Sequence, residues 1–166
     1  MPCHAKHPLL HATIMRPTDE RIAEIAELLD AGPICYFHRP TGAIESLPDP
    51  NGPYFEPEPW QEVIDKVESD WSNYERFEKM SSREGFEVME DFAHALAETD
   101  PRFRDRLLRI LSQRKPFRNF KDLVESSRYR EDWFAFKHQA YIEFEKRQLG
   151  PEAQRHGSRQ QVPQRL

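Results

Sequence analysis

Cations and aromatic rings stand close together in residues 114–121. The cations are Arg114, Lys115, Arg118 and Lys121, the rings are Phe117 and Phe120, and no Asp or Glu lies among them. On a helix, Arg118 and Lys121 share one face by their i, i+3 spacing, while the two phenylalanines share another. Cations in this pattern can bind phosphate oxygens, with the amides of a helix N-terminus assisting them. We therefore take the four cations as candidate binding residues.

A structural role for the same segment is the alternative. In that case Phe117 and Phe120 fill the core together with Trp133 and Phe136, and the cations meet the acidic stretch 45–75. That stretch holds nine acids and one base, Lys66. The whole chain has a net charge of −5, so it offers no overall basic field for nucleic acid. Any binding of nucleic acid would depend on a local patch.

The other residues with suitable chemistry are histidines and cysteines. Residue types that can bind zinc occur near the start of the chain: Cys3, His4, His7 and His11. Pro2 and Pro8 interrupt the helix that would align these histidines, so we predict no metal site. His38, His94 and His138 are isolated in sequence, and only the fold could place them in an active site. The common catalytic and nucleotide-binding motifs are missing, so we predict no catalytic residue and no cofactor.

Capping signals and apolar periodicity predict about six helices. Thr18 is suited to cap the first, which Gly32 and the following proline should end. Ser81 and Glu84 have the spacing of a capping box, and Asp100 precedes a proline at a helix start. A short helix is expected over 117–125 and a long one from about Arg130 to Leu149.

The segments 34–38 and 43–47 are typical of strands, and the turn between them contains Pro40 and Gly42. A third strand is expected within 74–80, because a hairpin alone is only marginally stable. We predict an α+β fold in which a small antiparallel sheet of about three strands packs with the helices, and the C-terminal half is all helical. The expected organisation is a loose N-terminal arm at 1–15, one domain at 16–149 and a disordered tail at 150–166.

Composition indicates a cytoplasmic protein. The chain has 166 residues and two cysteines, Cys3 and Cys35, which do not form a disulfide framework. No apolar run approaches the roughly 20 residues that a membrane span needs, and no signal peptide is recognised. We therefore expect a cytoplasmic location and no membrane partner. The oligomeric state does not follow from the sequence.

Two segments carry a recognisable combination of residues. The first combines Ser82-Arg83-Glu84-Gly85-Phe86 with Met89-Glu90-Asp91-Phe92, and the second runs from Lys115 to Asp122 and is followed by Trp133-Phe134-Ala135-Phe136-Lys137. Both segments resemble an uncharacterised bacterial family of small cytosolic proteins. Members of the family carry a Phe-Arg-x-Phe-Lys-Asp segment and then a Trp-(Tyr/Phe)-x-Phe helix. The resemblance covers about 16–149 and implies an α+β cytosolic domain, but no reaction. Lys115-Pro116 departs from it, because the family has Gly and a small residue there, and Asn119 replaces a second Arg.

The segregated charge and the missing catalytic motifs favour a non-catalytic protein-binding or adaptor domain whose partner is another protein. The first alternative is a nucleic-acid-associated protein that uses the basic-aromatic segment 114–121. The second alternative is an enzyme of unknown class, with an active site that the sequence does not reveal.

Overall fold

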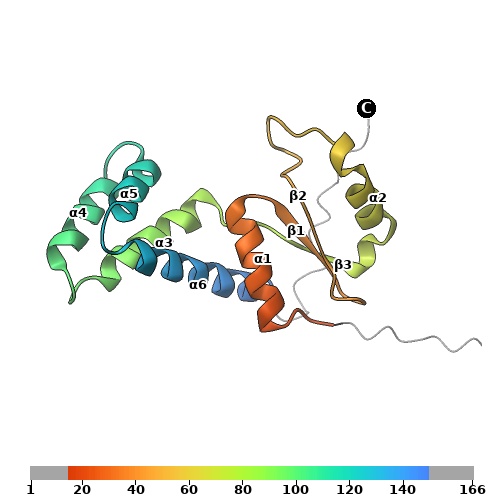
Figure 1. Ribbon diagram of the computed structural model, residues 1–166, viewed down its shortest axis with the longest axis horizontal. Helices are drawn as coiled ribbons and strands as arrows, with labels where there is room; N and C mark the ends of the chain where they lie inside the picture. The colour runs from red at the N-terminus through yellow and green to blue at the C-terminus, as the bar shows by residue number, and fades with distance from the viewer. Residues whose placement is uncertain (1–14, 150–166) are drawn as a thin grey trace, which may run out of the picture. The chain divides into compact units, whose positions relative to one another are not determined.

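The computed structural model describes residues 15–149, which group into two compact units, 15–79 and 80–149. Within these residues six α-helices and one three-stranded antiparallel sheet are present, as the α+β prediction requires (Figure 1). Each unit has a buried apolar cluster of its own. The predicted arm and tail fall almost wholly outside the described residues, and the single domain at 16–149 stays a prediction.

The unit 15–79 begins with helix α1 (Asp19–Ala31). The Thr18 side chain accepts a hydrogen bond from the Arg21 amide, which confirms the predicted N-cap. At the other end Gly32 takes the left-handed conformation, with φ of 117°, and its amide donates to the carbonyl of Leu29. A glycine adopts this conformation without steric cost, so the helix ends where the sequence predicts.

The sheet of this unit consists of β1 (Ile34–His38), β2 (Ile44–Leu47) and β3 (Tyr74–Phe77), in the order β2-β1-β3. The predicted hairpin is confirmed, with Tyr36 opposite Glu45 across the strand pair. The third strand is also confirmed, although it is shorter than the alternating segment 74–80. Strand β1 lies between β2 and β3 and is antiparallel to both.

Two short 3-10 helices, η1 (Glu58–Trp60) and η2 (Trp71–Asn73), flank helix α2 (Gln61–Ser69). Val67 of α2 is buried against a cluster from the sheet, and Trp60 packs half-buried at its edge. The cluster itself comprises Ile34, Tyr36, Leu47, Val67 and Tyr74. Helix α2 and the end of β2 are thereby held against a common apolar surface.

The unit 80–149 is helical in all its described elements. These are α3 (Ser82–Ala95), α4 (Pro101–Leu111), α5 (Pro116–Glu125) and α6 (Arg130–Gln148). The predicted capping box is present, with Ser81 accepting from the Glu84 amide and the Glu84 carboxylate accepting from the Ser81 amide. Asp100 caps α4 by accepting from the Phe103 amide at 3.0 Å. These caps satisfy backbone donors that a helix start leaves unpaired.

Aromatic rings form the centre of this unit. Trp133 lies edge-on to Phe92 and Phe120, with ring centroids 5.2 and 5.0 Å apart. Phe120 is fully buried and Trp133 is 6% exposed, so both belong to the core as predicted. Phe136 is half-buried and packs on Phe92.

Candidate functional site

The turn between α4 and α5 presents the predicted binding segment. Lys115 has a φ of 55°, and it is the only non-glycine residue with a positive φ in the described part of the chain. The Asn119 side chain donates to the carbonyl of Arg114 at 3.0 Å, and the Asn119 amide donates to the carbonyl of Lys115. A left-handed residue with a side chain costs about 1–2 kcal/mol. A glycine adopts this conformation without that cost.

The four predicted cations divide into two pairs. Arg118 lies 3.8 Å from Asp122, and Lys121 lies 3.8 Å from Glu125, so both have an acid one turn ahead on α5. Arg114 and Lys115 are exposed, and their side chains form no ion pair with the described residues. The local charge available to a ligand therefore comes from the turn more than from α5.

Phe117 corrects a sequence prediction, because it does not lie in the core. Its side chain is 46% exposed, and one edge of its ring contacts Phe86 at a centroid distance of 6.4 Å. The ring also lies over Gly85, where an added Cβ would come within 3.5 Å of it. Phe117 stands in the first turn of α5, directly after Pro116, while Phe120 and Val124 further along supply the buried face. The apolar spacing does place these residues on one face of α5, but the core covers that face only at Phe120 and Val124.

Helix α4 adds a row of arginines that the sequence interpretation missed. Arg102, Arg106 and Arg109 are exposed, and their i, i+4, i+7 spacing puts them on one face. None of the three forms an ion pair within the described residues, whereas Arg104 pairs with Asp105. The helical spacing was readable in the sequence and could have revealed them.

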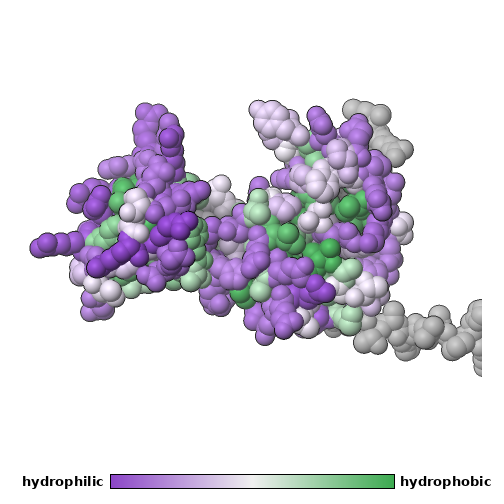
Figure 2. Space-filling model, in the orientation of Figure 1, coloured by the Kyte–Doolittle hydropathy of each residue, from purple (hydrophilic) through white to green (hydrophobic). Residues whose placement is uncertain are grey.

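We call Arg102, Arg106, Arg109, Arg114 and Lys115 the basic surface. It belongs to a segment, 101–121, with eight Lys and Arg and a single acid. Figure 2 shows hydrophilic side chains projecting from the region of α4 and α5. The N-terminal end of the α5 helix dipole adds to the positive potential. This arrangement can hold carboxylate or phosphate groups.

His38 is the one predicted histidine that the structure joins to a carboxylate. Its Nε2 lies 2.8 Å from Asp70, which can only accept, so Nε2 donates. On the other side of the ring, Nδ1 lies within hydrogen-bond distance of the Thr41 hydroxyl, 2.7 Å away. The hydrogen bond from His38, followed by the one from the Asn73 side chain, holds the pKa of Asp70 below its usual range. His94 is exposed on α3 and His138 is half-buried on α6.

The His38 cluster has the partners of a nucleophile, base and carboxylate relay. Such chemistry also needs backbone donors aimed at a developing oxyanion. The amides of Thr41 and Gly42 already donate to the carbonyl of His38, at 3.3 and 2.7 Å. The cluster is therefore better suited to fixing the hairpin turn against η2 than to acyl transfer.

Glu145 is a second unusual acid, because it is fully buried on α6. Its Oε2 accepts from the Gln148 amide at 2.8 Å, whereas its Oε1 has no hydrogen-bond partner among the described residues. Burial, with a smaller contribution from the charge of Glu84, raises the pKa of Glu145 to about 8 against the opposing effect of Gln148. The carboxyl group is therefore mostly protonated at neutral pH.

Within residues 15–149 no group of three or more His, Cys, Asp or Glu is placed to hold a metal ion. The predicted ligand candidates near the start of the chain lie outside these residues. The described helices also include none with the length and apolarity needed to cross a membrane.

A family model described as "Uncharacterised protein family (UPF0158)" matches residues 54–145. This match covers more than half of the chain, and the protein belongs to that family. The family resemblance is thereby confirmed for these residues, while the bacterial source and the cytoplasmic location stay predictions. No curated protein and no solved structure matches the chain.

Proposed function

We propose that this protein is a protein-binding domain of the adaptor type, and that its basic surface holds an acidic segment of another protein. The observation that carries the proposal is the row of exposed arginines on α4, which Arg114 and Lys115 extend into the turn. Five cations without acidic partners in the described structure provide charge for a ligand, because no internal ion pair has to be broken first.

The composition of the surface supports a protein partner. Protein interfaces are enriched in Arg and aromatic residues and depleted of Lys. Four of the five cations are arginines, and the half-exposed ring of Phe117 follows Lys115 after one proline. A half-exposed phenylalanine close in sequence to arginines is a suitable anchor for an apolar side chain within an acidic segment.

The strained lysine gives independent support. A glycine at position 115 would adopt the left-handed conformation without cost, yet the chain carries a cation there. Strained backbone at a surface turn is typical of functional positions. We therefore include Lys115 in the binding surface.

Charge also weighs against the nucleic-acid alternative. The unit 15–79 holds fifteen Asp and Glu against six Lys and Arg, a net charge of −9. A nucleic acid is a long polyanion, which the acidic net charge of the protein disfavours, whereas a short acidic segment needs only the basic surface.

The test places a photo-crosslinking residue, p-benzoylphenylalanine, at Phe117 in the full chain, expressed in the cells from which the gene comes. We expect a protein crosslink that maps to an acidic segment of the partner and is lost in R102E/R106E/R109E. The matched control is R83E/R130E/R147E, which reverses three exposed arginines that belong to α3 and α6. This control should keep the crosslink.

Binding is then measured with a fluorescent peptide of the crosslinked acidic segment, and with single-stranded RNA and duplex DNA in parallel. The protein-binding proposal expects peptide binding that R102E/R106E/R109E removes. Crosslinks to nucleic acid, with an affinity that falls steeply with salt, would establish the alternative instead. A crosslink unaffected by charge reversal on α4 would contradict both the protein-binding proposal and the nucleic-acid alternative.

A further inference from the structure

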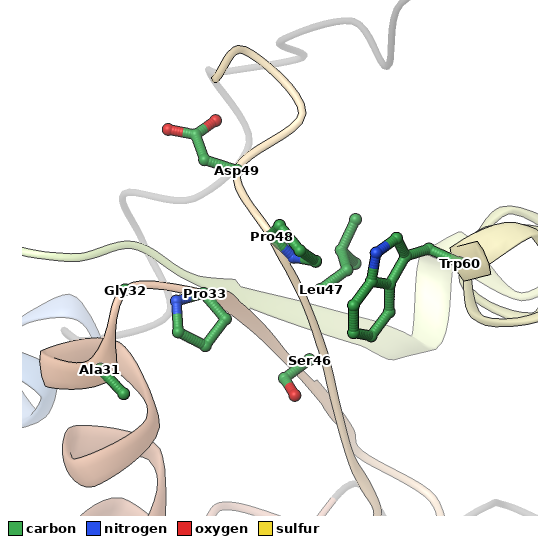
Figure 3. A pocket seen from close by; sticks show the side chains of 8 residues that line it. All are labelled: Ala31, Gly32, Pro33, Ser46, Leu47, Pro48, Asp49 and Trp60. Carbon is green, nitrogen blue, oxygen red and sulfur yellow. The ribbon is translucent and has the colours of Figure 1, made fainter. Parts of the chain in front are cut away.

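An open groove of about 370 Å³ lies at the end of β2, in the unit that does not carry the basic surface. Figure 3 shows its floor, formed by Ser46, Leu47 and Pro48, between Pro33 on one side and the indole of Trp60 on the other. Its volume falls within the range of ligand sites in proteins.

Local structure fixes both walls of the groove. Gly32 ends α1 in the left-handed conformation and turns the chain so that Pro33 begins the approach to β1. An added Cβ at Gly32 would meet no atom within 4 Å, so this corner of the groove is open. On the other side Trp60 packs half-buried against the core of the unit, which holds the indole in place.

The polar chemistry of the groove favours a donor carrying positive charge. Two of the lining residues, Pro33 and Pro48, have no backbone N–H to offer. Asp49 also lines the groove, with its carboxylate on the side away from Trp60 (Figure 3), and its Oδ1 accepts from the Asn51 amide at 2.9 Å. Trp60 provides the aromatic face to which a cation binds best.

The charge of the surrounding unit is complementary to the same ligand. Residues 45–75 carry nine acids and one base, and that base, Lys66, already pairs with Glu45. The apolar floor suits the methylene stem of a long cationic side chain, while its charged end meets the indole of Trp60 and is attracted by the surrounding acids, Asp49 among them.

We propose that this groove binds an arginine or lysine side chain in a basic segment of a partner protein. The proposal does not rest on the function assigned to the basic surface, because the residues, the unit and the sign of the charge all differ. It gives the protein a second binding site, and the ligand of that site has the opposite charge.

The three tryptophans of the chain, Trp60, Trp71 and Trp133, provide the test. Their indole N–H signals are followed by NMR in the full chain, and W60F assigns the signal of Trp60. The probe is a short peptide in which arginine alternates with leucine and proline, and the control peptide has citrulline in place of arginine. We expect only the Trp60 signal to move, only with the arginine peptide. Movement of Trp71 alone, or no movement, would overturn the proposal.

Asp49→Asn tests the charge at the groove, and Asp65→Asn is the matched control, because Asp65 is an exposed acid of the same unit. D49N should weaken binding of the arginine peptide by about fivefold, the effect of losing one partly exposed charge pair. D65N should leave it unchanged. An equal loss in both variants would show attraction by general charge and no specific groove.

Three further measurements complete the test of the occupant. Spermidine should compete with the peptide only weakly, and competition as strong as that of the peptide would contradict a protein segment as the ligand. R102E/R106E/R109E should bind the arginine peptide normally, so a failure of the basic surface and a failure of the groove remain distinguishable. Salt-sensitive self-association that D49N abolishes would replace the partner protein with a second copy of this chain.

Discussion

Replacing Glu145 by Gln should make the stability of the protein less sensitive to alkaline pH. Glu145 is fully buried, and its folded-state pKa of about 8 compares with an ordinary value of 4.5. Because the pKa is raised in the folded state, protonation of this carboxyl stabilises the folded state, and the stabilisation is complete at pH values below 4.5. This contribution is lost progressively as pH rises from 4.5 through about 8.

The expected magnitude follows from the same two values. Each pKa unit corresponds to about 1.4 kcal/mol, so the full difference is at most about 5 kcal/mol. Between pH 6 and pH 9 the wild type should lose roughly 2–3 kcal/mol of unfolding free energy through this one group. E145Q should not show this loss, because the neutral amide can still accept from Gln148 and never ionises.

The assay is urea unfolding of the full chain at pH 6, 7, 8 and 9, followed by circular dichroism. The control is E143Q, which removes the charge of an exposed acid on the same helix. We expect the E145Q and wild-type curves to diverge as pH rises, and the E143Q and wild-type curves to stay parallel. Parallel curves for E145Q would refute the conclusion that Glu145 is held neutral by burial.

The remaining predictions concern the core, the turns and the cluster at the hairpin. Trp133→Ala should lower the free energy of unfolding by about 3–5 kcal/mol. Phe117→Ala should lower it by under about 1 kcal/mol, because the Phe117 ring is half-exposed. Chemical denaturation of the two variants measures both values. Lys115→Gly should raise stability by up to about 1 kcal/mol by relieving the left-handed strain, yet weaken binding of the crosslinked acidic peptide, and a loss of stability would contradict the strain. Asp70→Asn should flatten the acid limb of the stability profile. Because the pKa of Asp70 is lowered in the folded state, its contribution to stability is present at pH values above its ordinary pKa and is lost as pH falls below that pKa. An unchanged acid limb would show that the bond to His38 does not stabilise the fold.

The helix boundaries could be predicted because their causes are local. Thr18, Ser81 and Asp100 each bond to an amide three residues ahead, so a short window of sequence contains the whole interaction. Gly32 likewise ends α1 through its own backbone conformation. The sheet was predictable for a related reason, since its first two strands are joined by a short turn.

The His38 cluster could not be predicted because its partners are far apart in sequence. Asp70 lies 32 residues after His38, and only the pairing of β1 with β3 brings its segment to the hairpin. Phe117 was misassigned for a different reason. Apolar spacing shows which residues share a helix face, but it does not show how much of that face another element covers.

The basic surface illustrates why net charge alone is a poor guide to binding. The chain is acidic overall at −5, yet residues 101–121 carry eight cations and one acid. Screening at physiological salt limits electrostatic interactions to about 8 Å, so a ligand at α4 responds to its local charges. Of the four cations predicted from sequence, Arg118 and Lys121 already have acidic neighbours on α5. The arginines of α4, which the prediction passed over, have none within the described residues. Reversing charge on α4 should therefore weaken binding of the acidic peptide more than reversing charge at positions 118 and 121.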